Sequence, residues 1–222
     1  VKVAQKDLID NGLDRKKIVP ILYRPFDVRY TYYTGKSRGF LCMPRPEVMQ
    51  HMMRENLGLI TCRQQNKIGF HHVLITDNIV ESCAVSNRTR EIGYLFPLYL
   101  YPSSDKNHLF EEKDEQNEKV PNLNPELIKQ LNEIYKINVA PEEIFNYIYA
   151  ILYSNIYREK YAEFLKIDFP RIPFTSDYNC FKEMGELGRK LTNLHLLSSS
   201  KLDNPISKFR GQGSGMVEKV KY

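Results

Sequence analysis

Five consecutive polar residues between two predicted strands carry side chains suited to reading nucleic-acid bases. They are Arg63, Gln64, Gln65, Asn66 and Lys67. Arginine forms paired hydrogen bonds with guanine, glutamine and asparagine do so with adenine, and lysine contacts phosphate. We therefore interpret the first four as candidate base contacts and Lys67 as a candidate contact to the phosphate backbone. A polar hairpin loop that binds nothing would have the same composition, so this alternative stays open.

A second group of basic and aromatic residues surrounds the first predicted strand. Arginine suits phosphate because its guanidinium offers several donors in a fixed fork. The candidate backbone contacts in this group are Arg24, Arg29, Lys36, Arg38 and Arg45, with aromatic support from Tyr30, Tyr32 and Tyr33. A solvated sheet surface would explain the same residues equally well.

The segment Asn87 to Arg90 is a third basic and polar loop of the same kind. Within it, Arg88 is a candidate base contact and Arg90 a candidate backbone contact. One good paired contact supplies about 1 to 3 kcal/mol of discrimination between bases, so two or three such contacts are enough for a short site.

The motifs of the common enzyme classes are missing from the sequence. It contains no Walker-type phosphate loop, no glycine-rich dinucleotide fingerprint, no HExxH and no Gly-x-Ser-x-Gly elbow. The five histidines are scattered, and the adjacent His71 and His72 point to opposite faces of a strand. We expect neither a catalytic residue nor a metal site in this chain.

The charge of the chain is unevenly distributed. The net charge is +5, the basic excess lies in the first hundred residues, and residues 102–133 are acidic. A basic, arginine-rich segment favours contact with a nucleic-acid backbone. Four cysteines lie far apart without a C-x-x-C pair, which favours reduced thiols in the cytoplasm. No membrane-length apolar run or secretory signal is visible, and we expect a cytoplasmic domain cut from a longer chain.

The element pattern predicts an α+β fold, in which a β-rich N-terminal lobe with a mixed or antiparallel sheet precedes a helical lobe. Residues 1–18 read as an arm and residues 19–101 as the β-rich lobe. Residues 19–33 alternate as a half-buried strand with Phe26, Val28, Tyr30 and Tyr32 on the buried side. A helix is expected from Pro44 to Glu55. Further strands are expected at residues 39–43, 57–62, 72–76 and 94–101.

The second half of the chain is predicted to be helical after a linker. Residues 102–124 have the acidic, proline-containing composition of a loop, and residues 125–197 form the helical lobe. Tyrosines and isoleucines at helical spacing lead into the stiff segment Pro170 to Pro173, because residues before prolines avoid the helical region. Residues 198–222 are expected to be a flexible tail and the start of a further section.

Several ordered segments together resemble one protein family from Ile18 to Tyr222. Each segment is weak alone, but the combination is specific. The segments are Tyr23 to Tyr33, Pro44 to Met52, the Arg63-Gln64 pair, Phe96 to Pro102, Tyr147 to Phe174 and Leu187 to Leu197. They look like the C-terminal target-recognition region of type ISP and other single-polypeptide restriction-modification enzymes, which carry an adenine-specific DNA methyltransferase and a helicase.

The resemblance implies that the chain recognises a short site in double-stranded DNA. It further implies a parent protein whose upstream nuclease, translocase and methyltransferase use Mg²⁺, ATP and S-adenosylmethionine to cleave DNA and to methylate adenine at N6. The chain itself would be non-catalytic and would position the target site for those domains. An alternative is a structural coupler that docks onto the methyltransferase or translocase without reading bases, since tyrosine is enriched at protein interfaces.

Overall fold

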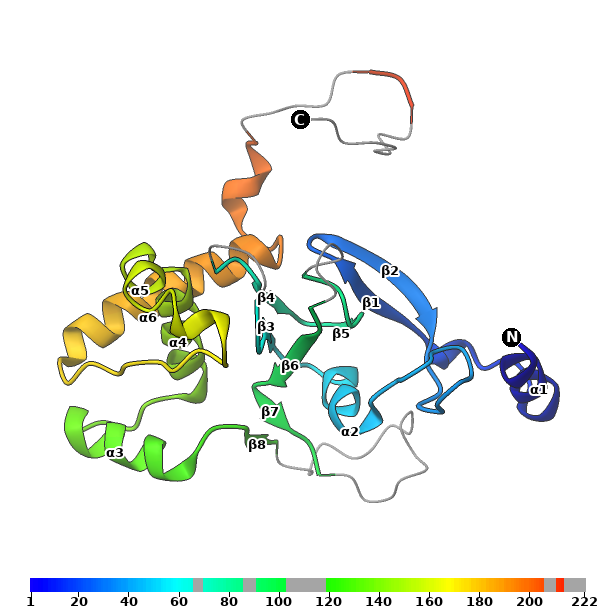
Figure 1. The fold of residues 1–222 in the computed structure, drawn as a ribbon, viewed down its shortest axis with the longest axis horizontal. Helices are drawn as coiled ribbons and strands as arrows, with labels where there is room; N and C mark the ends of the chain where they lie inside the picture. Colours follow the sequence, from blue (N-terminus) through cyan, green and yellow to red (C-terminus); the bar gives the residue numbers. More distant parts are fainter. Residues whose placement is uncertain (66–69, 86–90, 103–118, 206–210, 214–222) are drawn as a thin grey trace.

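The structure, a computed structural model, describes residues 1–65, 70–85, 91–102, 119–205 and 211–213. Its elements follow the long axis of the molecule, as Figure 1 shows. Helix α1 (Lys2–Asn11) lies at one end, the strands occupy the middle, and the helices of the second half of the chain gather at the other end. The predicted α+β class, with the strands first and the helices last, is confirmed.

The first sheet is mixed and has the strand order β2-β1-β5. Strands β1 (Ile18–Arg24) and β2 (Asp27–Tyr32) form an antiparallel hairpin, and β1 also pairs in parallel with β5 (Ile79–Val80). The short helix η1 (Arg15–Lys17) leads into this hairpin. Because β2 pairs only with β1, it is an edge strand of the sheet.

The second sheet is antiparallel and has the order β4-β3-β6. Its central strand β3 (Gly58–Cys62) lies between β4 (Val73–Thr76) and β6 (Gly93–Pro97). After β6 the chain leaves this sheet, and β7 (Tyr99–Leu100) pairs instead with β8 (Val120–Pro121). Proline has no backbone N–H to donate to a ladder, which agrees with Pro97 lying at the end of an edge strand.

A buried asparagine joins the strands to the short helical segment α2 (Pro46–Met49) and η2 (Gln50–Met53). The Asn56 amide donates to the carbonyls of His51 and Tyr99 at 3.0 and 2.8 Å, and its Oδ1 accepts from the Tyr99 N–H at 3.1 Å. Three of its hydrogen-bonding positions are thereby satisfied, as a buried amide requires.

The four α-helices of the second half of the chain begin at caps that are visible in the sequence. Asn124, Ser154 and Asp177 each accept a backbone N–H with the side chain, and Glu143 accepts the N–H of Ala140. The helices are α3 (Pro125–Tyr135), α4 (Pro141–Tyr153), α5 (Asn155–Lys160) and α6 (Tyr178–His195), with the short η3 (Phe164–Lys166) and η4 (Ser200–Asp203).

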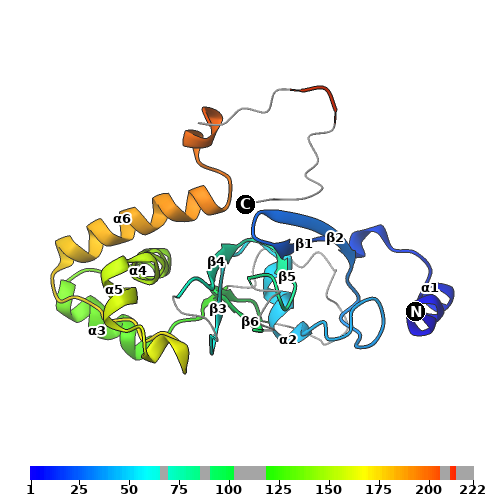
Figure 2. The ribbon, with the colours of Figure 1, turned by 45° about the horizontal axis from the view of Figure 1, so that its top comes forward.

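One hydrophobic core joins the strands to the helices. Val73 and Ile75 of β4 are buried together with Tyr149 and Leu152 of α4. A second core on the other side of α4 holds residues of α3 and α6, and Figure 2 shows these two helices beside α4. Since α4 contributes to both cores, it fixes the helices relative to the second sheet.

Three local predictions are wrong. Residues 19–33 form the β1–β2 hairpin and not a single strand. Its apolar side is not buried, because Val28 and Tyr30 of β2 are 49% and 76% exposed and Phe26, in the turn before β2, is 54% exposed. The reason is that β2 is an edge strand and the buried positions are taken by Ile21 and Leu22 of the inner strand β1. Residues 39–43 form no strand either; within them only Leu41 makes an isolated bridge, to Ser37.

The closest approach of α6 to α4 depends on a glycine. A Cβ on Gly188 would lie 1.9 Å from the carbonyl oxygen of Asn146, whereas a Cβ on Gly185 would lie 3.7 Å from its nearest neighbour, the carbonyl of Glu143. We expect Gly188→Ala to lower the free energy of unfolding by about 1 to 3 kcal/mol, since one of the two backbones must move.

The matched variant is Gly185→Ala on the same helix. It should leave the free energy of unfolding unchanged or raise it by up to about 1 kcal/mol, because alanine is the better helix former. Urea unfolding followed by far-ultraviolet circular dichroism measures both. Equal effects of the two variants would contradict the role assigned to Gly188.

Candidate nucleic-acid interface

The first candidate base contacts follow directly on β3. Arg63 and Gln64 are exposed where the chain leaves the central strand of the second sheet, whereas Gln65 is buried. The remaining candidates of the polar loops, Asn66, Lys67, Arg88 and Arg90, lie outside the residues that the structure describes.

The Arg63 side chain is held by a carboxylate from the helical half of the chain. Its Nε donates to Asp168 Oδ1 at 3.2 Å, while the two side chains stay 60% and 52% exposed. The Phe169 backbone N–H and the Arg63 guanidinium hold the pKa of Asp168 below its usual value. Asp168 is therefore charged at neutral pH and keeps one edge of the guanidinium in place.

Gln65 faces inward rather than toward solvent. It is 6% exposed, its Oε1 lies 2.8 Å from His72 Nδ1, and its backbone N–H donates to the carbonyl of Lys166 at 3.2 Å. His72 Nε2 in turn lies 2.9 Å from the carboxylate of the buried Glu91. Gln65 thus anchors the chain beneath Gln64, and we do not include its side chain among the base contacts proposed below.

The segment that follows Asp168 is fixed by tyrosine hydroxyl groups. Three tyrosines donate to alternate carbonyls along residues 171–175. The pairs are Tyr157 with Arg171 at 2.9 Å, Tyr147 with Pro173 at 2.9 Å, and Tyr135 with Thr175 at 2.5 Å.

Burial raises the pKa of each of these tyrosines, that of Tyr135 to about 12, so the hydroxyls remain protonated donors at neutral pH. The segment runs between η3 and α6 and forms neither a helix nor a strand. Its carbonyls therefore need partners from side chains. The tyrosines of α3, α4 and α5 supply these partners.

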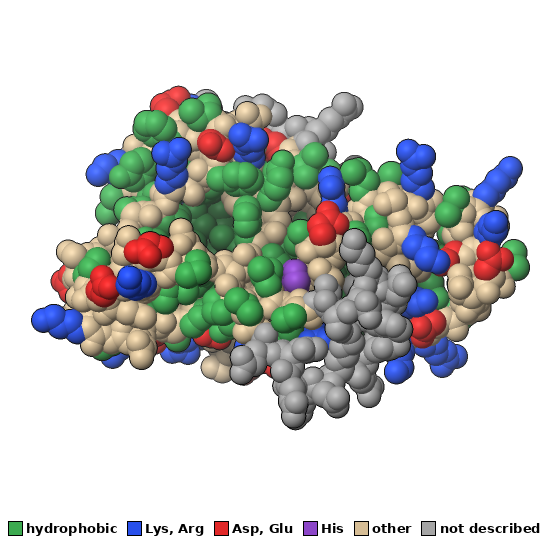
Figure 3. All heavy atoms as spheres, turned by 90° about the horizontal axis from the view of Figure 1, so that it is seen from below, with side chains coloured by type: hydrophobic (Ala, Val, Ile, Leu, Met, Phe, Trp, Pro, Cys, Tyr) green, Lys and Arg blue, Asp and Glu red, His purple; other side chains and the backbone are tan. Residues whose placement is uncertain are grey.

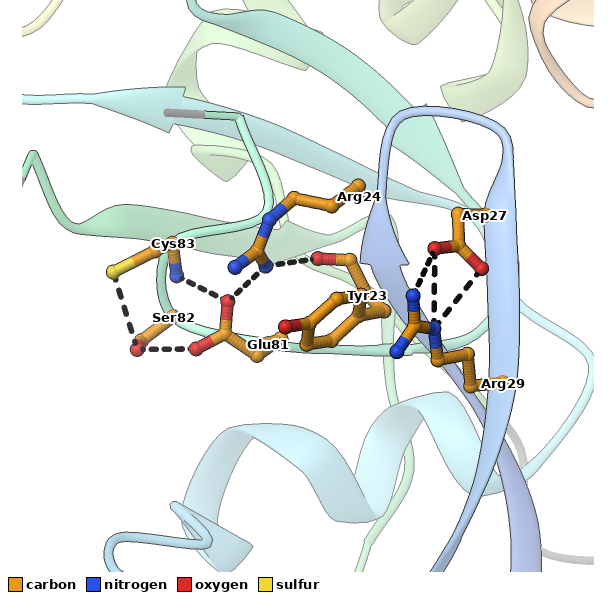
Figure 4. A network of polar contacts seen from close by, with 7 residues as sticks. All are labelled: Tyr23, Arg24, Asp27, Arg29, Glu81, Ser82 and Cys83. Atoms are coloured by element: carbon orange, nitrogen blue, oxygen red, sulfur yellow. Dashed lines mark hydrogen bonds and ion pairs between the residues drawn. The ribbon is translucent and has the colours of Figure 1, made fainter. Parts of the chain in front are cut away.

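The first two backbone candidates belong to a network at the hairpin, shown in Figure 4. Arg24 pairs with Glu81 at 2.7 Å and Arg29 with Asp27 at 2.8 Å. The Tyr23 ring lies 4.0 and 3.9 Å from the two guanidinium carbons. Both arginines are therefore already engaged by carboxylates, although the side chain of Arg29 remains 57% exposed.

The other three backbone candidates lie along residues 36–45 and are all exposed. Lys36 pairs with Asp7 at 2.6 Å, Arg45 with Glu47 at 3.7 Å, and Arg38 has a positive φ of 62°. The Arg45–Glu47 pair is exposed on both sides, and such a pair contributes about 0 to 1 kcal/mol, so it does not prevent Arg45 from turning to a phosphate. Lys36 is itself 63% exposed, but its partner Asp7 is only 14% exposed.

The three candidate tyrosines have different environments. Tyr30 is exposed, and Tyr32 is half-buried with its hydroxyl accepting the Asp14 N–H at 3.1 Å. Tyr33 is fully buried and donates to the carbonyl of Pro44 at 2.9 Å. Only Tyr30 presents most of its ring to solvent.

Sequence reasoning missed the contribution of the helical half to this surface. Asp168 pairs with Arg63, and the exposed Arg171 adds a second positive charge near Asp168. The Phe169 ring packs edge-on against Tyr94 and Phe96 of β6, with centroid distances of 5.0 and 5.6 Å. The Pro-Arg-Ile-Pro sequence predicts a rigid segment, but it does not indicate that the preceding Phe169 packs against β6.

The face in Figure 3 has a hollow lined largely by hydrophobic side chains, with lysines and arginines mostly at its periphery. Acidic side chains lie among these basic ones, so the face carries no continuous positive groove. Among the described residues, no three His, Cys, Asp or Glu side chains converge to hold a metal ion. None of the described helices is long and apolar enough to cross a membrane.

The comparison with protein families identifies the class. The Type ISP C-terminal specificity domain matches residues 1–222, and the chain belongs to this family. None of the curated proteins compared matches the chain.

Two solved structures resemble this fold. One is a cryoEM structure of a DrdV-DNA complex, with 28% identity, a TM-score of 0.64, and coverage of 88% of this chain and 18% of that chain. The other is a nuclease-deletion mutant of the Type ISP restriction-modification enzyme LlaGI in complex with a DNA substrate mimic. Its identity is 23% and its TM-score 0.57, with coverage of 83% of this chain and 14% of that chain, and its likeness is one of fold. The chain thus spans less than a fifth of either protein.

The tyrosine hydroxyls make a direct prediction about stability. Tyr157→Phe and Tyr147→Phe should each lower the free energy of unfolding by about 0.5 to 1.5 kcal/mol, because each leaves a carbonyl of the 171–175 segment without its donor. Tyr30→Phe is the matched control, since Tyr30 is 76% exposed. Urea unfolding compares the three variants. A cost for Tyr30→Phe as large as for the other two would contradict the assignment.

Proposed function

We propose that this chain recognises a sequence in double-stranded DNA as the specificity domain of a restriction-modification enzyme, with Arg63 and Gln64 touching the bases. The observation that carries the proposal is the placement of Arg63. Its guanidinium is exposed, yet one edge is fixed by Asp168 at 3.2 Å. Such a guanidinium is already oriented and keeps donors for the edge of a guanine base. Both properties favour direct readout of a base.

The comparison with DrdV supports DNA as the ligand, because that protein was solved as a DNA complex and is 28% identical to this chain. In this proposal residues 19–101 read the DNA, and residues 125–197 support them after the 102–124 linker. The parent protein methylates adenine at N6 and cleaves DNA with its upstream domains in the cytoplasm. In this proposal S-adenosylmethionine, ATP and Mg²⁺ are used by those upstream domains.

Contacts to the phosphate backbone fall to the exposed cations of the first half of the chain. Lys36, Arg38 and Arg45 are free to move toward a phosphate, since their side chains are exposed. Arg24 and Arg29 would have to exchange carboxylate partners for phosphates. We therefore assign them the weaker contribution.

A docking role is the second candidate function, favoured by exposed hydrophobic side chains on β6 and around η3. Tyr94, Phe96, Phe164 and Ile167 are 43%, 40%, 70% and 63% exposed. Apolar surface of this kind is typical of protein contacts. Docking onto upstream domains and reading of DNA are compatible, since they use different residues.

Titration of fluorescent duplex DNA followed by anisotropy tests the proposal. The affinity should fall steeply with salt, because bound phosphates release counterions. Arg63→Ala should reduce discrimination between sequences by about 1 to 3 kcal/mol at one base pair. Lys36→Ala should weaken binding to all sequences alike. It should also lower the slope of log affinity against log salt concentration by about 1.

Lys129→Ala provides the control, because Lys129 is an exposed lysine of α3 in the helical half. It removes the same charge as Lys36→Ala but should leave the salt slope unchanged. Absence of binding at low salt would contradict DNA recognition by this chain. Identical effects of Arg63→Ala and Lys36→Ala on all sequences would overturn the division of roles.

A further inference from the structure

The carboxylate that holds Arg63 is itself fixed by its own backbone. Asp168 Oδ1 accepts the N–H of Phe169 at 2.9 Å and the Nε–H of Arg63 at 3.2 Å. One oxygen thus receives both donors, and the first of them is independent of the arginine. The carboxylate is oriented whether or not Arg63 is present.

The position of Asp168 relative to Arg63 is set by the second sheet. Phe169 packs against Tyr94 and Phe96 of β6, and β6 pairs with β3, which ends one residue before Arg63. The rings that anchor the carboxylate therefore lie on β6, and Arg63 directly follows the neighbouring strand β3. A shift of one relative to the other would require these strands to separate.

A second hydrogen bond joins the same stretch of chain to the helical half. The Gln65 N–H donates to the carbonyl of Lys166, and the Gln65 side chain is buried. Arg63 and Gln65 are thus both bound to residues 166–168, while Gln64 between them is exposed. Residues of the helical half of the chain thus hold the residues that directly follow β3.

The hydrogen bond to Asp168 uses only one edge of the guanidinium. Nε is the donor, and the end formed by Nη1 and Nη2 has no hydrogen-bond partner among the residues that the structure describes. Two parallel donors at that end match the O6 and N7 acceptors of guanine. A fixed Nε edge therefore leaves the base-reading end turned outward.

We propose that Asp168 is a positioning residue for sequence recognition: it orients the Arg63 guanidinium from the helical half so that the Nη1 and Nη2 donors meet a base edge. This inference rests on the proposed function. Its effect should be on discrimination rather than on folding. An exposed ion pair adds little stability, whereas a long side chain that is already ordered loses less freedom on binding.

The test uses the 222-residue chain and selection from a pool of random duplexes, read by sequencing. Arg63→Ala should abolish the preference at one base pair. Asp168→Asn keeps an oxygen for the Phe169 N–H but removes the charge. It should reduce discrimination at that same base pair by about two- to tenfold and leave the other positions unchanged. Asp168→Glu, which keeps the carboxylate, should recover part of the preference.

Glu186→Gln is the matched control, because it removes the same charge from an equally exposed pair, with Arg189 at 2.7 Å on α6. Both charge-removing variants should raise the affinity for all duplexes slightly and alike. Only Asp168→Asn should change the preference. In the Arg63→Ala background, Asp168→Asn should cause no further loss of preference, since the two residues act as a unit. The free energy of unfolding of Asp168→Asn should stay close to that of the wild type.

The outcomes separate the inference from the proposed function. If Arg63→Ala loses a preference and Asp168→Asn behaves like Glu186→Gln, the positioning role is overturned and DNA recognition stands. Loss of preference at every position in Asp168→Asn, together with a lower free energy of unfolding, would assign Asp168 a structural role and also overturn the inference. If the wild-type chain selects no sequence at all, the proposed function is overturned, and the positioning role that rests on it is overturned as well.

Discussion

The backbone of residues 171–175 has no ladder or helix to satisfy its carbonyls, and the structure depends on the three tyrosine hydroxyls that do so. Each hydroxyl comes from a different helix, so the segment is bound to α3, α4 and α5 at once. Because these bonds are partly buried, they are worth more than exposed contacts. The tyrosine-rich helices thereby hold in place the irregular segment that follows Asp168.

Stability and recognition rely on interactions of different strength in this domain. The shared core of α4 with β4, together with the close α4–α6 contact, fixes the two halves of the chain. The Arg63–Asp168 pair is exposed, and a pair of this kind contributes about 0 to 1 kcal/mol. The residues that orient the proposed base contact can therefore vary with little cost to the fold.

Much of the fold follows from local sequence signals. The caps at Asn124 and Asp177, the helical spacing of isoleucines in α4, and the short apolar runs of β3 and β4 predict their elements closely. The sequence could not predict that the apolar side of β2 lies in solvent, because alternation indicates a strand but not what covers it.

The candidate site likewise depends on tertiary contacts that the sequence does not show. Composition predicts Arg63 and Gln64 as base contacts, but the pairing with Asp168 joins residues 105 positions apart and depends on tertiary packing. The burial of Gln65 likewise depends on contacts with Lys166 and His72. Residue type tells what a side chain can bind, and only the fold tells which way it points.

The exposed edge strand β2 has a consequence for the domain when it is separated from a larger protein. Its outer backbone groups are unpaired in the first sheet, and Val28 and Tyr30 add apolar surface beside them. Such an edge can pair with another copy and start aggregation. The Asp27–Arg29 ion pair on the same strand opposes this by placing charges along the edge. The solubility of the isolated domain therefore depends on two charged residues outside its core.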